Sequence, residues 1–247
     1  MGDTVGERNS AAGTPGEDVD LCLGRREVAT GVELVRTGEG LALSGDGMVL
    51  RGDFSRMLPR LRKQNLAHEL VVRAARIRGV AAEQLRAIDA TAGLGEDALL
   101  LAAAGFSVTM YERDPAMAAL LEDALARAAR DSRLADAVSR MELRKKDSIP
   151  ELLRLATSSE DAPDIVLLDP MFPERKKSAA VKKKLQLIQR LEAPCSDEAE
   201  LLDAAIAAGP RKVLIKRPAK GPWLAGRKPS YSLSGKAIRY DVIALGR

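Results

Sequence analysis

The alternation of apolar and polar positions predicts strands and helices that follow one another along most of the chain. Short apolar runs predict strands ending near 88, at 108–112, 141–146, 165–168 and 213–216, and a terminal hairpin joining 231–233 to 240–245. Apolar residues at helical spacing predict helices at 66–78, from 96, at 115–130, from 178 and at 196–209. This order predicts an α/β fold, in which a mainly parallel sheet is covered by helices on both faces and extended by one antiparallel strand.

The first 65 residues follow a different pattern. Residues 1–17 contain almost no core-forming side chains and are expected to be a disordered tail. Short apolar runs at 32–35, 41–43 and 48–50, broken by glycines, predict a small sheet. We therefore expect a tail (1–17), a small β-rich N-terminal subdomain (18–65) and a larger α/β domain (66–247).

Length and composition limit the class of protein. The chain has 247 residues, of which 46% are apolar, enough for one α/β domain and a small addition. Cys22 and Cys195 show neither a disulfide framework nor a metal-binding spacing, which predicts a reducing, cytoplasmic location and no metal site. No signal peptide and no apolar run of membrane-spanning length is present, so no membrane partner is expected. The single histidine, His68, is given no catalytic role.

A glycine-containing loop is the first candidate binding site. It joins the strand that ends at Asp89 to the helix that begins at Glu96, and Gly93 and Gly95 let it turn sharply and admit a ligand to the backbone. The same spacing fits a dinucleotide-binding loop, so a nicotinamide-dependent dehydrogenase is an alternative. The carboxylates of Asp89, Glu96 and Asp97, however, would repel a pyrophosphate. They suit the ammonium and ribose groups of S-adenosylmethionine (SAM).

Acidic residues also end the next two predicted strands. Glu112 follows the second strand, where a carboxylate can accept hydrogen bonds from ribose hydroxyls; a helix cap or surface acid is the alternative. Asp147 and Ser148 follow the third strand, near the expected position of an adenine. A surface turn explains that pair almost as well.

The stretch 167–173, Leu-Leu-Asp-Pro-Met-Phe-Pro, suits chemistry on the exocyclic amine of a nucleobase. Such an amine is a poor nucleophile, because its lone pair is conjugated into the ring. Asp169 and the carbonyl of Pro170 can accept its hydrogen bonds, and Phe172 can stack on the base. A strand end followed by a proline turn is the simpler interpretation of this motif taken alone.

Together these motifs resemble the RsmJ family of bacterial small-subunit ribosomal RNA guanine-N2 methyltransferases. The resemblance rests on segments 89–97, 112–115, 168–173, 176–183 and 216–218 and extends over residues 50–245. It implies a Rossmann-like class I SAM-dependent methyltransferase fold and methyl transfer to a guanine near the 3′ end of 16S ribosomal RNA. The cofactor contacts that the resemblance implies are Glu96, Asp97, Glu112, Arg113, Asp147, Ser148 and Asp169. Adenine-N6 transfer is the nearest alternative, since only the resemblance selects guanine.

The distribution of charge predicts a nucleic-acid partner. The net charge is +4, but residues 171–190 hold seven Lys and Arg against one acid, and residues 207–247 hold ten against one. These blocks flank the Asp169 motif, where an RNA backbone must pass if a base is to reach it. The alternatives are a solvated helix face and, for the whole chain, a non-catalytic RNA-binding assembly factor. We expect 16S ribosomal RNA or the small subunit as partner, with contacts at Arg175, Lys176, Lys177, Lys182, Lys183, Lys184, Lys216 and Arg217.

Overall fold

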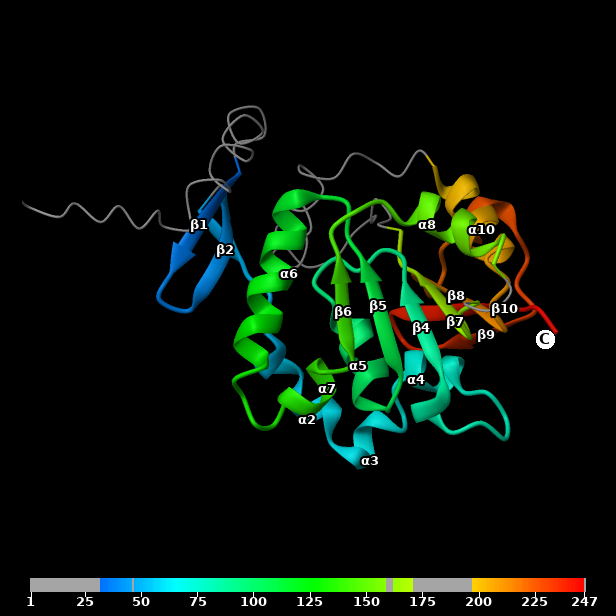
Figure 1. Cartoon of the computed structure of the whole chain (residues 1–247), viewed down its shortest axis with the longest axis horizontal. Helices are drawn as coiled ribbons and strands as arrows, with labels where there is room; N and C mark the ends of the chain where they lie inside the picture. The colour runs from blue at the N-terminus through cyan, green and yellow to red at the C-terminus, as the bar shows by residue number, and fades with distance from the viewer. Residues whose placement is uncertain (1–31, 46, 159–161, 171–196, 247) are drawn as a thin grey trace, which may run out of the picture.

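The computed structural model describes residues 32–45, 47–158, 162–170 and 197–246, which form a seven-stranded sheet, flanking helices and a small three-stranded sheet (Figure 1). The large sheet has the order β6-β5-β4-β7-β8-β10-β9. Its strands are β4 (Arg86–Asp89), β5 (Ser107–Tyr111), β6 (Met141–Arg144), β7 (Ile165–Leu168), β8 (Lys212–Pro218), β9 (Tyr231–Ser234) and β10 (Ile238–Ala244). Strands β4 to β8 are parallel and β10 is antiparallel to both of its neighbours, which confirms the predicted α/β fold.

The strand order reverses between β4 and β7. From β4 the chain adds β5 and β6 on one side, and then β7 and β8 on the other. In parallel sheets the loops that leave the carboxyl ends of such neighbouring strands open a crevice in which ligands bind. Asp89 ends β4 and Asp169 follows β7, so the two predicted motifs meet at this crevice.

Helices cover both faces of the large sheet. One core includes α4 (Leu70–Ala75), α5 (Glu96–Ala103) and α7 (Ala135–Val138), and the other α8 (Ser148–Leu155) and α10 (Glu198–Ala207). Because side chains alternate along a strand, Leu167 of β7 enters the first core while Val166 and Leu168 enter the second. The strands are therefore apolar on both sides, as a covered parallel sheet requires.

Helix α6 (Pro115–Ala128) links the large sheet to the small one. Asp114 caps it by accepting a hydrogen bond from the backbone N–H of Ala116 at 2.9 Å. Leu121 packs into the first core, whereas Met117 and Leu120 pack against the small sheet. In Figure 1 the helix stands between the two sheets.

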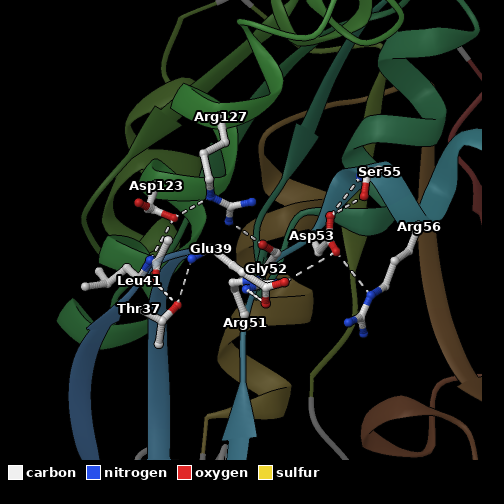
Figure 2. Close-up of polar contacts among 11 residues, drawn as sticks. Thr37, Glu39, Leu41, Arg51, Gly52, Asp53, Ser55, Arg56, Asp123 and Arg127 are labelled. Atoms are coloured by element: carbon white, nitrogen blue, oxygen red, sulfur yellow. Dashed lines mark hydrogen bonds and ion pairs between the residues drawn. The ribbon is translucent and has the colours of Figure 1, made fainter.

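The small sheet is held to α6 by apolar and polar contacts. Its strands are antiparallel: β1 (Glu33–Thr37), β2 (Gly40–Gly45) and β3 (Met48–Leu50). Figure 2 shows Arg127 of α6, which donates to Asp123 at 2.8 Å and to the carbonyl of Gly52. Asp123 also accepts the backbone N–H of Leu41 at 3.1 Å. These bonds connect α6 to the end of the small sheet at which β2 begins and β3 ends.

The helix predicted at 66–78 is wrong in extent. Within that range the helix proper is only α4, residues 70–75. Three short helices precede it: η1 (Phe54–Met57), α2 (Leu58–Leu61) and α3 (Lys63–Leu66). Two further short helices are η2 (Ala82–Gln84), which follows α4, and η3 (Leu224–Gly226), near the C-terminus. Glu69 has an extended backbone (φ −59°, ψ 131°) and forms a bidentate ion pair with Arg60 at 2.7–2.8 Å. This pair accompanies the break that precedes α4, and a periodic apolar pattern does not reveal it.

Candidate functional site

Five polar side chains, from four elements and the loop after β7, meet at the carboxyl edge of the large sheet. The ammonium of Lys216 (β8) lies 2.8 Å from Oδ2 of Asp97 (α5) and 2.9 Å from Oδ2 of Asp169, which follows β7. The hydroxyl of Tyr240 (β10) donates to the same oxygen of Asp97 at 2.9 Å. Asp89, at the end of β4, is 3% exposed and completes the group. We refer to these five residues as the carboxylate cluster.

Strand alternation explains how β8 supplies the ammonium. Leu214 belongs to the core on the α5 side of the sheet, and Ile215 belongs to the opposite core. Lys216 therefore faces the α5 side, where Asp97 lies, and Arg217 faces the α10 side. The side chain of Lys216 is only 25% exposed, because its ammonium lies against the carboxylates of Asp97 and Asp169.

The cluster carries more negative than positive charge. Burial, followed by the charge of Asp97, raises the pKa of Asp89 to about 8, so this carboxyl is protonated at neutral pH. Burial also raises the pKa of Asp169, and the ammonium of Lys216 opposes that rise. For Lys216, burial alone would lower the pKa, but the two carboxylates outweigh it and raise the pKa. The arrangement attracts a cation and disfavours a pyrophosphate.

The glycine loop has the conformation that its sequence predicts. Gly93 and Gly95 both have left-handed backbones, with φ of +53° and +73°. A Cβ on Gly95 would lie 2.7 Å from Leu121, so a larger residue there would clash with α6. Among the described residues, no heavy atom lies within 4 Å of the corresponding position on Gly93. The backbone at Gly93 is therefore open to a ligand.

Glu112 holds this loop in place. It is 6% exposed, and its two carboxylate oxygens accept the backbone N–H groups of Gly93 at 2.9 Å and Asp114 at 2.8 Å. Burial raises its pKa, while these two hydrogen bonds lower it. Each oxygen keeps a second acceptor site, so the carboxylate can also bind hydroxyl groups of a ligand.

Thr91 fixes the Asp169 turn to the glycine loop. Its hydroxyl accepts the backbone N–H of Asp169 at 2.6 Å, and its own N–H donates to Asp89 at 3.2 Å. The sequence did not single out Thr91; its place two residues after a strand-end aspartate is the available signal. Pro170 is buried behind this turn, while Glu96 is exposed on the first turn of α5.

The remaining predicted cofactor residues lie at the ends of β5 and β6. Arg113 lies 2.8 Å from Asp197 and 3.7 Å from Asp147. Asp147 caps α8 by accepting the N–H of Ile149 at 2.9 Å, and Ser148 is buried. Asp147 therefore has a structural role, whatever else it binds.

Two predicted RNA contacts point inward. Arg217 is 1% exposed, lies 3.9 Å from Glu198 and donates to the carbonyl of Pro222 at 3.0 Å. That position does not permit the predicted contact of Arg217 with an RNA phosphate. Lys216 forms ion pairs with Asp97 and Asp169, but its side chain is 25% exposed, so its predicted contact with RNA stays a prediction. Other predicted site residues lie outside the described residues: Phe172, Arg175, Lys176, Lys177, Lys182, Lys183 and Lys184.

Residues 32–45, 47–158, 162–170 and 197–246 contain no grouping of three histidine, cysteine or acidic side chains suited to a metal ion. They also contain no helix with the length and apolar character needed to cross a membrane.

Comparison with known proteins gives consistent matches. Residues 26–244 match the family described as "Putative SAM-dependent methyltransferase". The chain is 43% identical over 182 residues to "Ribosomal RNA small subunit methyltransferase J" of Thioalkalivibrio sulfidiphilus, covering 74% of this chain and 70% of that protein. It is 48% identical over 165 residues to the protein of that name from Pseudomonas aeruginosa strain UCBPP-PA14, covering 66% of this chain but only 62% of the relative.

A solved structure supports the same fold. The crystal structure of the SAM-dependent methyltransferase NGO1261 from Neisseria gonorrhoeae superposes with a TM-score of 0.69 at 31% identity. The superposition covers 87% of this chain and 84% of that one. The predicted Rossmann-like class I methyltransferase fold is thereby confirmed.

Proposed function

Because the chain belongs to the ribosomal RNA small subunit methyltransferase J family of SAM-dependent methyltransferases, we propose that it methylates the exocyclic N2 of a guanine near the 3′ end of 16S ribosomal RNA. The observation that carries this proposal is the position of Asp169. It follows β7 at the strand-order reversal and is joined through Lys216 to Asp97 beside the glycine loop. Such an enzyme is expected to work in the cytoplasm, where ribosomal subunits are assembled.

The residues present fit SAM as the cofactor. When bound, SAM supplies an electrophilic methyl group on a sulfonium. The open backbone at Gly93 and the carboxylate of Glu112 would hold its ribose side, and the carboxylate of Asp97 would favour its positive charge. A dehydrogenase loop would instead have to accept a pyrophosphate beside these acids, so the family and the chemistry of the site agree.

Asp169 would orient the target amine. Its carboxylate and the carbonyl of Pro170 accept the two N–H groups of the guanine amine, which directs the nitrogen lone pair toward the methyl group. Phe172 would stack on the flipped base. Positioning then supplies most of the rate, and the proton leaves easily once the nitrogen carries the new methyl group.

Lys216 would keep Asp169 in its accepting form. Burial raises the pKa of Asp169 and so favours its protonated form, which would offer a hydrogen-bond donor where the target amine needs an acceptor. The ammonium of Lys216, 2.9 Å away, lowers this pKa and so favours the carboxylate. The contact of Lys216 with Asp97 further fixes Asp169 relative to α5. The basic block at 175–184 would guide the RNA backbone toward this edge.

Mass mapping of small-subunit RNA from cells with and without the protein tests this function. We expect one N2-methylguanine near the 3′ end of 16S RNA to disappear without the protein and to return with the wild-type chain, but not with Asp169→Ala. Loss of an N6-methyladenine instead would establish the adenine alternative. Unchanged methylation would overturn the proposal.

A further inference from the structure

The loop that joins β8 to β9, residues 219–230, has a fixed inner side and a basic, aromatic outer side. We refer to it as the β8–β9 loop. It contains η3 and the single tryptophan of the chain, Trp223. Neither the glycine loop nor the carboxylate cluster uses any of its side chains.

Two buried arginines bind the backbone at the start of this loop. Arg239 donates from Nη1 to three carbonyl groups within residues 218–221 at 2.8–3.1 Å, and Arg217 donates to the carbonyl of Pro222 at 3.0 Å. Arg239 is itself fixed by Asp241 through bonds of 2.8 and 2.9 Å. Because the carbonyl groups bind these arginines, this part of the loop is held in one conformation.

The middle of the loop is anchored by packing. Leu224 is 1% exposed and belongs to the core that α10 covers. Ala225 has a φ of +47°, and among the described residues it is the only residue other than glycine with a positive φ. A backbone conformation of this kind persists only where the surrounding contacts impose it.

The outward side chains of the loop are cationic and aromatic. Lys220, Arg227 and Lys228 are exposed, and Trp223 is 43% exposed. Within the described part of the chain, none of these three cations forms an ion pair. The only acidic residue in 207–247 is Asp241, which is buried against Arg239. The outer side thus presents an aromatic ring among positive charges that no acid on the same segment offsets.

The loop starts at the edge that holds the carboxylate cluster. Strand β8 is parallel to β7, and only three residues separate Lys216, which contacts Asp169, from Lys220. The N–H of Ala219 bonds to the carbonyl of Ala237 at 3.0 Å, which brings the exposed Lys236 of the β9–β10 turn to the same edge. In Figure 1 this orange and red part of the chain lies beside α10.

We propose that Lys220, Trp223, Arg227 and Lys228 form a contact surface for a single-stranded segment of the RNA that carries the target base. The proposal rests on the proposed function and extends it. Bases of single-stranded RNA stack on exposed aromatic rings, while neighbouring cations bind the phosphates. The position of the loop beside Asp169, where the target base would bind, favours RNA over an acidic protein as the partner. Because the loop is already ordered, RNA binding loses little conformational entropy there.

Tryptophan fluorescence tests the contact directly, because all tryptophan emission comes from Trp223. The probe is a single-stranded oligoribonucleotide with the 3′-terminal sequence of 16S RNA, titrated into the full chain with SAM. We expect RNA to quench the emission and to shield it from iodide. Trp223→Ala should weaken binding by roughly 5- to 150-fold, the range expected for one stacked base. SAM affinity and melting temperature should remain close to those of the wild type.

A pair of matched variants tests the charges. Arg227→Gln/Lys228→Gln should weaken RNA binding and reduce the slope of log affinity against log salt by about 1.4, or roughly 0.7 for each lost phosphate contact. The control, Arg78→Gln/Arg130→Gln, removes two exposed cations at the opposite edge of the sheet and should leave the slope near that of the wild type. RNA that binds with unchanged fluorescence and with wild-type affinity in both loop variants would overturn the proposed surface. A wild-type chain that binds no RNA would overturn the proposed function as well.

Discussion

Replacing Lys216 by Met is the most informative single change in the carboxylate cluster. Methionine keeps an unbranched apolar side chain of similar length but removes the ammonium that lies between Asp97 and Asp169. The two carboxylates then lose their shared cation. We expect Asp169 to bind a proton more readily, so that the enzyme needs a higher pH to present an acceptor to the target amine.

The distances give the size of this effect. Two unit charges 2.9 Å apart interact by about 6 kcal/mol at an effective dielectric constant of 20. Both side chains are partly exposed, so solvent screening reduces the interaction to about 1.5–3 kcal/mol at most, the range for a hydrogen bond to a charged group. Its loss in Lys216→Met should therefore raise the pKa of Asp169.

The assay is the pH dependence of single-turnover methyl transfer to small-subunit RNA. In the wild type the rate falls as Asp169 becomes protonated, so raising this pKa moves the acid limb of the profile to higher pH. Lys216→Met should show that shift, with partial recovery of the rate at alkaline pH. Tyr240→Phe, which removes one hydrogen bond to Asp97 but no charge, is the control and should keep the wild-type limb. An unshifted limb in a folded Lys216→Met protein would refute the reasoning.

Three other changes test separate parts of the site. Glu112→Ala should weaken SAM binding in calorimetry by about 1.5–3 kcal/mol, because a buried charged acceptor and the bond that fixes Gly93 are both lost; equal affinities would contradict this. Asp89→Asn should gain stability relative to the wild type as pH rises from about 4 to about 8, by at most about 1.4 kcal/mol per unit. The reason is that the folded carboxyl stays neutral up to a pKa of about 8, whereas the unfolded one ionises near 3.8. The free energy of unfolding in urea of Asp89→Asn, minus that of the wild type, should therefore be larger at pH 8 than at pH 5. Equal differences at the two pH values would count against this. Replacing Lys182, Lys183 and Lys184 by Gln should weaken RNA binding and flatten its salt dependence without changing SAM affinity; an unchanged salt slope would mean that these lysines are only solvated.

The sequence predicts the large sheet well because each of its parts has a strong local signal. Asp114 and Pro115 mark the start of α6, and Gly93 and Gly95 mark the turn after β4. The apolar run of β7 is confirmed with the same bounds that were predicted. Capping residues, glycines and apolar runs act within a few positions, so a single chain reveals them.

The inward positions of Lys216 and Arg217 were missed because they depend on the neighbours of β8. Within a basic C-terminal block both residues resemble surface cations. Only the pairing of β8 with β7 and β10 makes the strand central, so that alternation directs one side chain to Asp97 and the other to Glu198. Likewise, Tyr240 reaches Asp97 across 143 positions of sequence, and no local pattern indicates that contact.

Transfer of radiolabelled methyl from SAM to small-subunit RNA, followed by nucleoside analysis, tests the central claim most directly. It compares the wild type with Asp169→Ala and Asp169→Asn, each shown to bind SAM. We predict N2-methylguanosine with the wild type, none with Ala, and a greatly reduced rate with Asn, which keeps a carbonyl acceptor but not the charge. Near-normal transfer by Asp169→Ala would contradict the account, because the amine would then be oriented by other groups.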